Sequence, residues 1–599
     1  LQPAVGPSYF AVGGPNADVT IGSADKASAF KYQLVLDSMG AAIRTATFRE
    51  FDNLDPKDPK PLTVLAPIEM RNGEVLSLAS EALIVADQGR RLNLSRLSWR
   101  SLDVEQLQDG GASAAFEATI VDGNDRPVLK LTKTYRVHPD NYMLDGSIRV
   151  ENLDGKEHRV YYDLNGPVGL PADAAYRRTM DLRKVVAAFK TSSGEIQSVG
   201  KAMKALAKPK TDKDRELNLD HKEATFLWAA SVSKYFAGIL VPTTADGQPG
   251  GDWIAGRWGV YYNPDQDDKH SSGDESLGFV VRSASIKLEP AGSQTHSFQL
   301  YLGPKDKSRF DKVELYRQLG FVHTIDFMSC CCPTSIINPL AFGILAIMKW
   351  MYFVIPNYGI VIIILVFFMR LALHPITKKS QIAMHKMSKL APRAEEIKQK
   401  YGNNKAEMNK KLMELYREQG ASPIMGFLPM FVQMPIWIAL WSAIYTSIDL
   451  RGAAFLPFWI TDLSAPDALV PLGNLRVPLL GWHIGSLNLL PILMGVAFYL
   501  QQKLTPMQQA SAATNPQMAQ QQKIMNIMMP LMFPLMLYTA PSGVNLYIMS
   551  STFAGVIEQY VIKKHIREKE EQESQGLIPT TSKMGGKVKK KKPKPFYRF

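Results

Sequence analysis

The residue best placed to do chemistry is Arg370, a fixed positive charge within an otherwise apolar stretch of membrane length. The run from Tyr358 to Met369 leads directly into it, and His374 follows four residues later. Arginine is costly inside a membrane span, so it usually faces a bundle interior or a wet cavity, where it can meet an anionic partner. The alternative is that it snorkels, since the His374 end of the run lies roughly 6 Å away at 1.5 Å per residue. Arg370 alone does not decide between the two.

Further polar side chains fall within the neighbouring apolar runs. They are Gln433, Ser442, Asn545, Ser550, Ser551 and Thr552. Such residues can join helices by hydrogen bonds. Together with Arg370 they can instead line a hydrophilic groove.

The first 320 residues carry no comparable chemistry. We find no nucleophile–base pattern there, and no His spacing typical of zinc ligands. We therefore predict no metal site and no cofactor. The chain is expected not to be an enzyme, and its N-terminal part is expected to be a structural or interaction domain.

Charge location sets the orientation. The segment from Lys378 to Glu418 has 11 Lys or Arg against 5 Glu, and the segment from Lys563 to Phe599 has 12 against 4. These two segments account for the whole net charge of +13. Basic segments that flank spans stay in the cytoplasm. The two segments are therefore predicted to lie inside, and residues 1–320 outside.

The elements that must position these groups differ along the chain. Residues 1–320 show short alternating stretches bounded by Gly, Asp, Asn and Pro, which predict an antiparallel β-sandwich. Clear examples are residues 31–36, 41–48, 130–137, 259–262 and 297–302. Residues 200–216 are interpreted as a basic helical or mobile insertion.

Residues 351–562 are predicted to form a five-span helical membrane core. A short interfacial helix over residues 336–350 precedes it. The predicted spans are residues 356–373, 423–448, 486–504, 523–538 and 543–562, each near the roughly 20 residues that cross a bilayer. Five spans that start outside end inside, in agreement with the basic tail.

A basic segment over residues 378–420 separates the first two spans. It is predicted to fold into two helices, 380–400 and 405–419, that form a hairpin at the cytoplasmic membrane surface. Four methionines fall in it: Met384, Met387, Met408 and Met413. Flexible Met suits a landing surface for many apolar partners. Core filling and a solvated charged face are the alternatives.

The tail over residues 563–599 ends in a polycation that includes Lys589, Lys590, Lys591 and Lys592. Such a run has little tendency to fold. It can bind ribosomal RNA or anionic lipid, and contact with the ribosome is the preferred interpretation.

At residues 340–563 the order of motifs resembles the YidC/Oxa-type membrane protein insertases. The matching pieces are Ile362-Ile363-Ile364, Arg370, His374-Pro375-Ile376-Thr377-Lys378, Leu390-Ala391-Pro392, Pro429-Met430-Phe431-Val432-Gln433-Met434-Pro435-Ile436-Trp437, Leu493-Met494-Gly495, Gln522-Lys523-Ile524-Met525 and Pro541-Ser542-Gly543-Val544-Asn545-Leu546-Tyr547. The soluble part resembles, more loosely, the periplasmic β-sandwich of the Gram-negative branch.

The resemblance implies a positively charged groove in the inner leaflet, closed to the outside. Arg370 would attract acidic residues of a substrate there, Gln433 falls in the matching second span, and Tyr547 aligns with a family tyrosine that contacts substrate helices. The implied partners are nascent membrane proteins and the Sec translocon. The family gives no reason to expect an ATP site, and no Gly-rich phosphate loop with Lys is present.

Three features depart from the family pattern. Gram-negative members begin with an anchor span that is missing here, so we expect an incomplete N-terminus. Cys330, Cys331 and Cys332 form neither a zinc nor a disulfide pattern. Glu558 lies at a depth similar to that of Arg370, and we hypothesise that the two pair across the groove until a substrate carboxylate displaces Glu558.

The sequence thus predicts an α + β multidomain membrane protein of the bacterial inner membrane, with residues 1–320 periplasmic and the tail cytoplasmic. Its predicted function is that of an insertase and chaperone for membrane proteins, acting as a monomer, alone or with the Sec translocon. A transporter or anion channel with Arg370 as its selectivity charge is the alternative, although we find no inverted repeat. A scaffold led by the external sandwich is a third hypothesis.

Overall fold

The computed structural model describes residues 9–55, 58–86, 89–171, 181–219, 224–244, 246–264, 274–328, 332–401, 404–418, 423–477, 482–504, 524, 528 and 530–574. The chain forms two compact units. One contains residues 1–345 and 439–452, and the other contains residues 346–438 and 453–599.

The first unit is built on antiparallel sheets. In the described part of the chain the largest sheet has eleven strands, of which nine follow one path: β1 (Phe10–Val12), β12 (Ala112–Val121), β13 (Pro127–Val137), β14 (Met143–Asn152), β23 (Ser293–Pro304), β19 (Phe236–Thr243), β18 (Thr225–Val232), β16 (Lys184–Lys190) and β17 (Ile196–Ala202). Two short strands, β10 (Arg100–Ser101) and β11 (Glu105–Gln106), pair with β12.

Three smaller sheets complete this unit. The six-stranded sheet contains β20 (Ile254–Tyr262), β21 (Ser276–Ser283), β15 (His158–Asn165), β8 (Ser80–Val85), β9 (Arg90–Asn93) and β22 (Ile286–Leu288). The four-stranded sheet contains β2 (Asp18–Gly22), β3 (Tyr32–Asp37), β4 (Ala42–Asp52) and β5 (Pro61–Leu65). A hairpin is formed by β6 (Ile68–Met70) and β7 (Gly73–Val75).

One continuous core joins these sheets. A single cluster of buried side chains includes Leu34 of β3, Phe116 of β12, Leu164 of β15, Trp228 of β18 and Phe279 of β21. Strands such as β13 and β14 alternate between buried and more exposed residues, because β-strand side chains point to opposite faces in turn. Strands β18 and β19 are instead buried along nearly their whole length. The β-rich, antiparallel N-terminal part is confirmed, and the five example stretches lie in strands except for their first residues Lys31 and Ala41.

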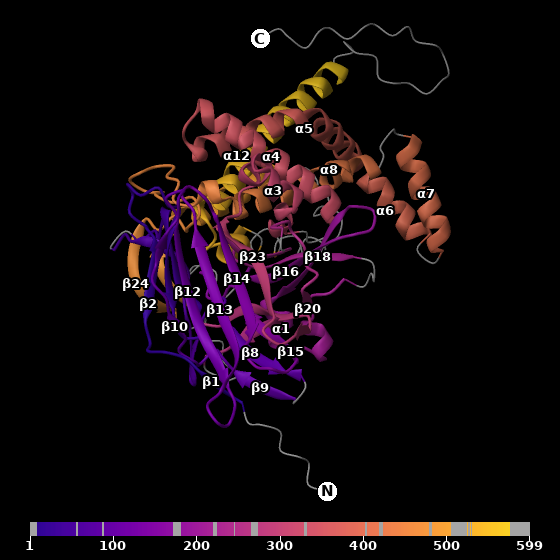
Figure 1. Cartoon of the computed structure of the whole chain (residues 1–599). Helices are drawn as coiled ribbons and strands as arrows, with labels where there is room; N and C mark the ends of the chain where they lie inside the picture. The colour runs from indigo at the N-terminus through magenta and orange to yellow at the C-terminus, as the bar shows by residue number, and fades with distance from the viewer. Residues whose placement is uncertain are drawn as a thin grey trace. The chain divides into compact units, whose positions relative to one another are not determined.

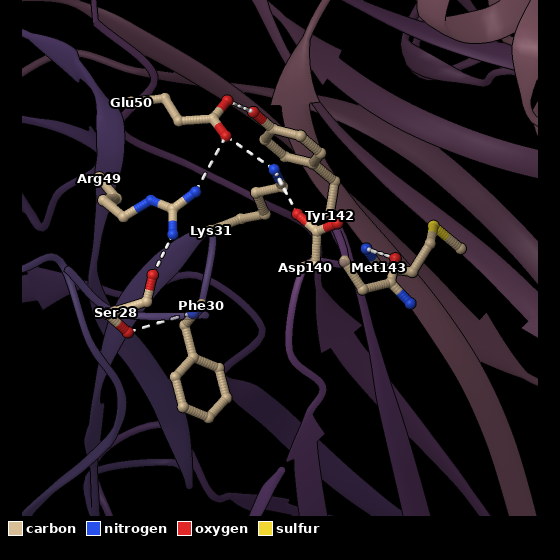
Figure 2. Close-up of polar contacts among 9 residues, drawn as sticks. Ser28, Phe30, Lys31, Arg49, Glu50, Asp140, Tyr142 and Met143 are labelled. Carbon is tan, nitrogen blue, oxygen red and sulfur yellow. Dashed lines mark hydrogen bonds and ion pairs between the residues drawn. The ribbon is translucent and has the colours of Figure 1, made fainter. Parts of the chain in front are cut away.

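A polar network at the edge of this core ties the β3–β4 hairpin to the turn before β14 (Figure 2). Lys31 Nζ lies 2.7 Å from Glu50 Oε1 and 2.5 Å from Asp140 Oδ1. The Tyr142 hydroxyl donates to the second oxygen of Glu50, at 2.5 Å. Arg49 donates to the Ser28 carbonyl and contacts Glu50 on the same side of the hairpin. Each charge in the network therefore meets an opposite charge or a hydrogen-bond partner.

The proposed basic insertion at residues 200–216 is mostly ordered structure. Its first residues belong to β17, and the rest include the short helix α1 (Met203–Ala207) and the 3-10 helix η2 (Asp212–Arg215). Short helices α2 (Lys307–Lys312) and α3 (Glu314–Gln318), with η3 (Phe321–Thr324), follow the last long strand.

The C-terminal part is helical (Figure 1). Its described helices are α4 (Thr334–Val354), α5 (Tyr358–Lys389), α6 (Ala391–Tyr401), α7 (Lys405–Glu418), α8 (Pro423–Thr446), η4 (Ile448–Leu450), α9 (Leu489–Leu504) and α12 (Ser542–Ser574). A two-stranded ribbon of β24 (Val470–Val477) and β25 (Trp482–Leu487) precedes α9. By length and composition, two of the described helices can cross a membrane, namely Thr334–Val354 and Tyr358–Lys386.

One boundary of the predicted hairpin was wrong, namely the start of its first helix. Helix α5 continues through Pro375 to Lys389, whereas a separate helix over residues 380–400 was expected. A proline inside a helix frees the carbonyl four residues earlier, here that of Leu371, and helices of this kind tolerate it where local adjustments satisfy that group. The break falls at Leu390 instead, because Pro392 has no N–H to continue the ladder of α5.

Three other helix boundaries differ from the predicted ones. Helix α4 has 21 residues, longer than the interfacial helix predicted over residues 336–350. Ser486 lies in β25, so the third predicted span begins at Leu489. Helix α12 runs to Ser574, past the expected end at Ile562, because residues such as Arg567 and Glu571 pair at i,i+4 spacing.

Several predicted features fall outside the described residues. They are Cys330, Cys331, residues 402–403 of the hairpin loop, most of residues 523–529, and the tail from residue 575 onward, which includes Lys589–Lys592.

His296 provides a test of the packing of the first unit. Its side chain stacks on Trp253 with ring centroids 4.8 Å apart, and its Nδ1 lies 2.9 Å from the Tyr162 hydroxyl. Burial lowers the pKa of His296 to about 4. Because the unfolded chain binds this proton more readily, stability is lost as the pH falls from the unfolded pKa toward 4. The loss amounts to about 3 kcal/mol at most.

We expect His296→Phe to flatten the pH dependence of unfolding between pH 6.5 and 4. The measurement is the urea midpoint of the first unit, followed by tryptophan fluorescence. Tyr162→Phe is the matched control, because it removes the hydrogen-bond partner and leaves the buried imidazole. An unchanged slope in His296→Phe contradicts this account.

Candidate functional site

The candidate site lies in the second unit, where α5 packs along α12 in the same direction. Arg370 of α5 contacts Ser551 of α12, and His374 contacts Glu558. A later residue of α5 contacts a later residue of α12, so the two helices run parallel. A parallel pair brings the polar groups of the two apolar runs to one level.

Arg370 has two partners on α12. Its Nη2 donates to Ser551 Oγ at 3.0 Å, and its Nη1 lies 3.5 Å from Glu558 Oε2. The other oxygen of Glu558 lies 3.0 Å from His374 Nδ1. The side chains of Arg370 and Glu558 are 19% and 9% exposed. The charge is thus held inside the helix cluster, and the pairing that the sequence suggested is present.

Gly555 makes room for the guanidinium. A Cβ on this glycine would lie 3.3 Å from both Nη1 and Nη2 of Arg370 and 3.1 Å from Nε2 of Gln501 on α9. The absence of a side chain therefore allows the arginine and the α9 amide to approach the α12 backbone. Tyr547, Ser551, Gly555 and Glu558 recur at helical spacing and define one polar face of α12.

Three parallel helices place these groups at the same depth. Arg370, Gln501 and Gly555 each come twelve or thirteen residues after the start of α5, α9 or α12. At 1.5 Å per residue this is roughly 18 to 20 Å from the common N-terminal end. The three residues lie at the same depth because one segment of the chain bonds to the starts of all three helices.

That segment, which we call the anchor, runs from residue 453 to residue 467. Asn357, just before α5, donates to the Phe455 carbonyl at 3.0 Å. Asp467 Oδ2 accepts from the backbone N–H groups of Leu489 and Leu490, which caps α9. Ser542, the first residue of α12, donates to the Asp462 carbonyl at 2.8 Å.

Three buried polar atoms near this level have no partner among the described residues. They are Arg370 Nε, Gln502 Oε1 on α9 and Gln559 Oε1 on α12. Buried polar groups are normally hydrogen-bonded, and each exception calls for an explanation such as water or a ligand. These atoms indicate a site that accepts further polar groups.

The other predicted groove residues are placed as follows. Tyr547 is buried on the polar face of α12, close enough to Arg370 to interact electrostatically. Gln433 is half-buried on α8, and no hydrogen bond joins it to Arg370 among the described residues. The structure gathers Arg370, Tyr547 and Glu558, and a role of Gln433 in the groove stays a prediction.

The predicted landing methionines are spread over two helices. Met384 and Met387 lie on the extension of α5, and Met408 and Met413 lie on α7. Met384 and Met408 are half-buried, and Met413 is exposed.

Sequence reasoning missed three residues of the site. They are His374, which contacts Glu558, Gly555, which lies against the Arg370 guanidinium, and Gln501, whose amide lies against the same glycine. Ser551 was among the polar side chains predicted to line a groove with Arg370, and it accepts a hydrogen bond from Arg370. His374 carried a usable signal, because it follows Arg370 at i+4 and so shares its helix face. Gly555 and Gln501 carried none, since their role depends on how α9 and α12 pack.

A second ionic contact lies further along the same interface. Glu570 of α12 contacts both His385 and Lys389 of α5. This contact repeats the arrangement at Glu558, in which one carboxylate meets two basic groups at i,i+4 spacing. No cluster of three or more metal-binding side chains occurs in the part of the chain that the structure describes.

Sequence comparison identifies the family. A family model described as the YidC periplasmic domain matches residues 28–340, and one described as the 60Kd inner membrane protein matches residues 350–570. This chain belongs to the YidC family. The two matches together cover both the β-rich part and the helical part.

Curated relatives in this family carry the name membrane protein insertase YidC. One from Chlorobium luteolum is 29% identical over 541 residues, which is 89% of this chain and 81% of that protein. One from Chlorobaculum parvum is 28% identical and covers 95% of this chain and 90% of that protein. Among solved structures, an active YidC insertase with its first transmembrane domain resolved matches 89% of this chain and 90% of that chain, at 16% identity and a TM-score of 0.32.

Gly555 allows a direct test of the site geometry. We expect Gly555→Leu to push the Arg370 guanidinium away from α12 and to destabilise the protein by about 1 to 3 kcal/mol. If the clash is with Arg370, the cost falls when Arg370→Gln is added, because contacting residues are not additive.

The measurement is thermal unfolding in detergent of the two single variants and the double variant. Ala554→Leu is the control for added bulk on the same turn. Additive effects of Gly555→Leu and Arg370→Gln contradict the geometry.

Proposed function

We propose that this chain is a membrane protein insertase and chaperone that moves short hydrophilic segments through a positively charged groove and releases apolar spans into lipid. The observation that carries the proposal is the placement of Arg370 at the depth of an apolar helix, beside Ser551, Gln501 and Glu558. A charge held at that depth lowers the barrier for a polar segment, because it replaces lost hydration with a fixed electrostatic partner.

Glu558 acts as the resting partner of Arg370 in this proposal. Its contact with Nη1, at 3.5 Å, is longer than the 2.7–2.9 Å typical of strong charge-assisted bonds. Glu558 also has an alternative partner in His374 at 3.0 Å. An acidic residue of a substrate can therefore take over the guanidinium while Glu558 stays bound to His374.

The proposed topology has five spans, with residues 1–320 periplasmic and the tail cytoplasmic. Spans one, three and five of such a topology all run from outside to inside. The parallel direction of α5, α9 and α12 and their shared anchor at residues 453–467 support this order.

The remaining parts are proposed to receive the substrate. The end of α5, with Met384 and Met387, and helices α6 and α7, with Met408 and Met413 on α7, form a landing surface for apolar segments at the cytoplasmic face. The tail lysines Lys589–Lys592 contact ribosomal RNA or anionic lipid. Gln433 and Tyr547 line the path, and the chain acts as a monomer, alone or beside the Sec translocon.

The test of the function uses the purified protein in liposomes and a single-span substrate with an acidic tail. We expect protease protection of the tail with the wild type and about tenfold or greater loss with Arg370→Ala, as follows from losing one charged hydrogen bond. Rising salt should narrow the difference only slightly, since partly buried charges such as Arg370 are screened much less than exposed ones.

Two controls sharpen this test. Arg370→Lys retains the charge and should retain part of the protection. A substrate whose acidic residues are replaced by amides should insert equally with the wild type and Arg370→Ala. No protection with the wild type, together with anion flux across the same vesicles, refutes the insertase and supports an anion channel.

The resting pair is tested by Glu558→Gln. Removal of the competing carboxylate should increase photocrosslinking of an acidic substrate tail to the chain by about threefold to tenfold. Glu568→Gln, an exposed change on the same helix, is the matched control. The displacement mechanism is wrong if Glu558→Gln leaves both insertion rate and crosslinking unchanged.

A further inference from the structure

The first unit contains a polar cavity that the insertion mechanism does not use. Its volume is about 290 Å³, and it is bounded by the β6–β7 hairpin, the turn after β9, and the ends of β15 and β20. Three asparagines, a glutamate, a tyrosine and an arginine are among its lining residues: Asn72, Glu81, Asn93, Arg96, Asn165 and Tyr262. A cavity of this size lies at the lower limit of small-molecule sites.

Two of its polar groups are free to bind a ligand. Glu81 accepts a long bond of 3.4 Å from Asn165 Nδ2 and contacts no basic side chain in the described part of the chain. The Tyr262 hydroxyl has no hydrogen-bond partner among the described residues. Burial and the charge of Glu81 raise the pKa of Tyr262, so its hydroxyl remains a donor. Asn165, only 3% exposed, is the last residue of β15 and donates the long bond to Glu81.

The backbone beside the lining residue Ala79 is held in a strained conformation. Leu78 and Ala41 have φ values of 54° and 48°, a left-handed region that non-glycine residues rarely adopt. Their carbonyls are held from strand β13: Lys133 Nζ donates to the Leu78 carbonyl, and the Tyr135 hydroxyl donates to the Ala41 carbonyl at 2.7 Å.

Lys133 is fully buried, and its amine also contacts Ser80 Oγ at 3.3 Å. Burial lowers the pKa of Lys133 well below its usual value. Among the described residues, the Lys133 amine meets a backbone carbonyl and a hydroxyl and forms no ion pair with a carboxylate. Its buried side chain therefore stabilises the conformation of this turn.

Backbone bonds complete the support of this turn. Leu78 N–H donates to the Gly166 carbonyl at 3.3 Å, and Asn165 N–H donates to the Ala79 carbonyl at 2.9 Å. Strained residues persist where the surrounding structure over-determines them, and they cluster at ligand sites. The turn that precedes the lining residue Ala79 is thus fixed before any ligand arrives.

We propose that this cavity binds a neutral saccharide, either a single sugar or the terminal ring of a longer glycan. The asparagine amides can both donate to and accept from vicinal hydroxyls, the Glu81 carboxylate accepts from them, and the Tyr262 ring offers an apolar face. A cation is disfavoured by Arg96, and an anion is disfavoured by Glu81. Glu74 at the rim adds no free charge, because Arg44 neutralises it at 2.8 Å.

The test uses the full chain in nanodiscs and saturation-transfer difference NMR. The probes are glucose, mannose, N-acetylglucosamine and their β-1,4-linked disaccharides at millimolar concentration. We expect saturable transfer to at least one of them. Glu81→Gln should weaken that binding about tenfold, the value of one hydrogen bond to a charged group.

Tyr262→Phe is the second variant, since it removes only a hydroxyl and keeps the ring. It should weaken binding about threefold to tenfold. Glu69→Gln is the matched control, an exposed change on β6 outside the cavity lining. The proposal is overturned if no sugar binds, if Glu69→Gln and Glu81→Gln bind equally, or if Glu81 instead supports binding of propylammonium ion.

Discussion

The burial of one positive charge among apolar helices is the constraint on which the second unit depends. A guanidinium on an apolar helix is tolerated only when it meets a carboxylate and hydrogen-bond acceptors, because transfer of an unpaired charge out of water is prohibitive. Arg370 meets both on α12, where Glu558 and Ser551 lie on one face. That contact fixes the rotation of α12 against α5, and it requires a residue without a side chain at Gly555.

The depth of the charge is set elsewhere in the chain. Residues 453–467 bond to the starts of α5, α9 and α12, so three helices that are distant in sequence begin at one level. Arg370, Gln501 and Gly555 lie twelve or thirteen residues from these starts, so their polar groups come to the same depth. The formation of this polar site therefore depends on the relative axial positions of the helices as well as on the residue types.

The first unit handles a buried charge differently. Lys133 meets a carbonyl and a hydroxyl instead of a carboxylate, and its pKa falls as a result of burial. Lys133 stabilises a turn, whereas Arg370 contacts a carboxylate that, in the proposed mechanism, a substrate carboxylate replaces. The contrast follows from geometry: the Leu78 carbonyl belongs to a backbone fixed on several sides, and Glu558 belongs to a side chain with two basic neighbours.

Local sequence patterns predicted the division into a β-rich part and a helical part and singled out Arg370 and Glu558, and the family resemblance added Tyr547. Strand alternation and apolar run length are local properties, so residues 130–137 and 358–373 could be assigned from neighbours alone. Helix ends were less predictable, because α9 begins where the distant Asp467 caps it and α5 continues past Pro375. Only the tertiary structure brought Ser551 and Gly555 to the guanidinium, placed Gln501 against the same glycine, and shaped the cavity beside Ala79. These contacts join residues far apart in the chain, and no local pattern records such pairs.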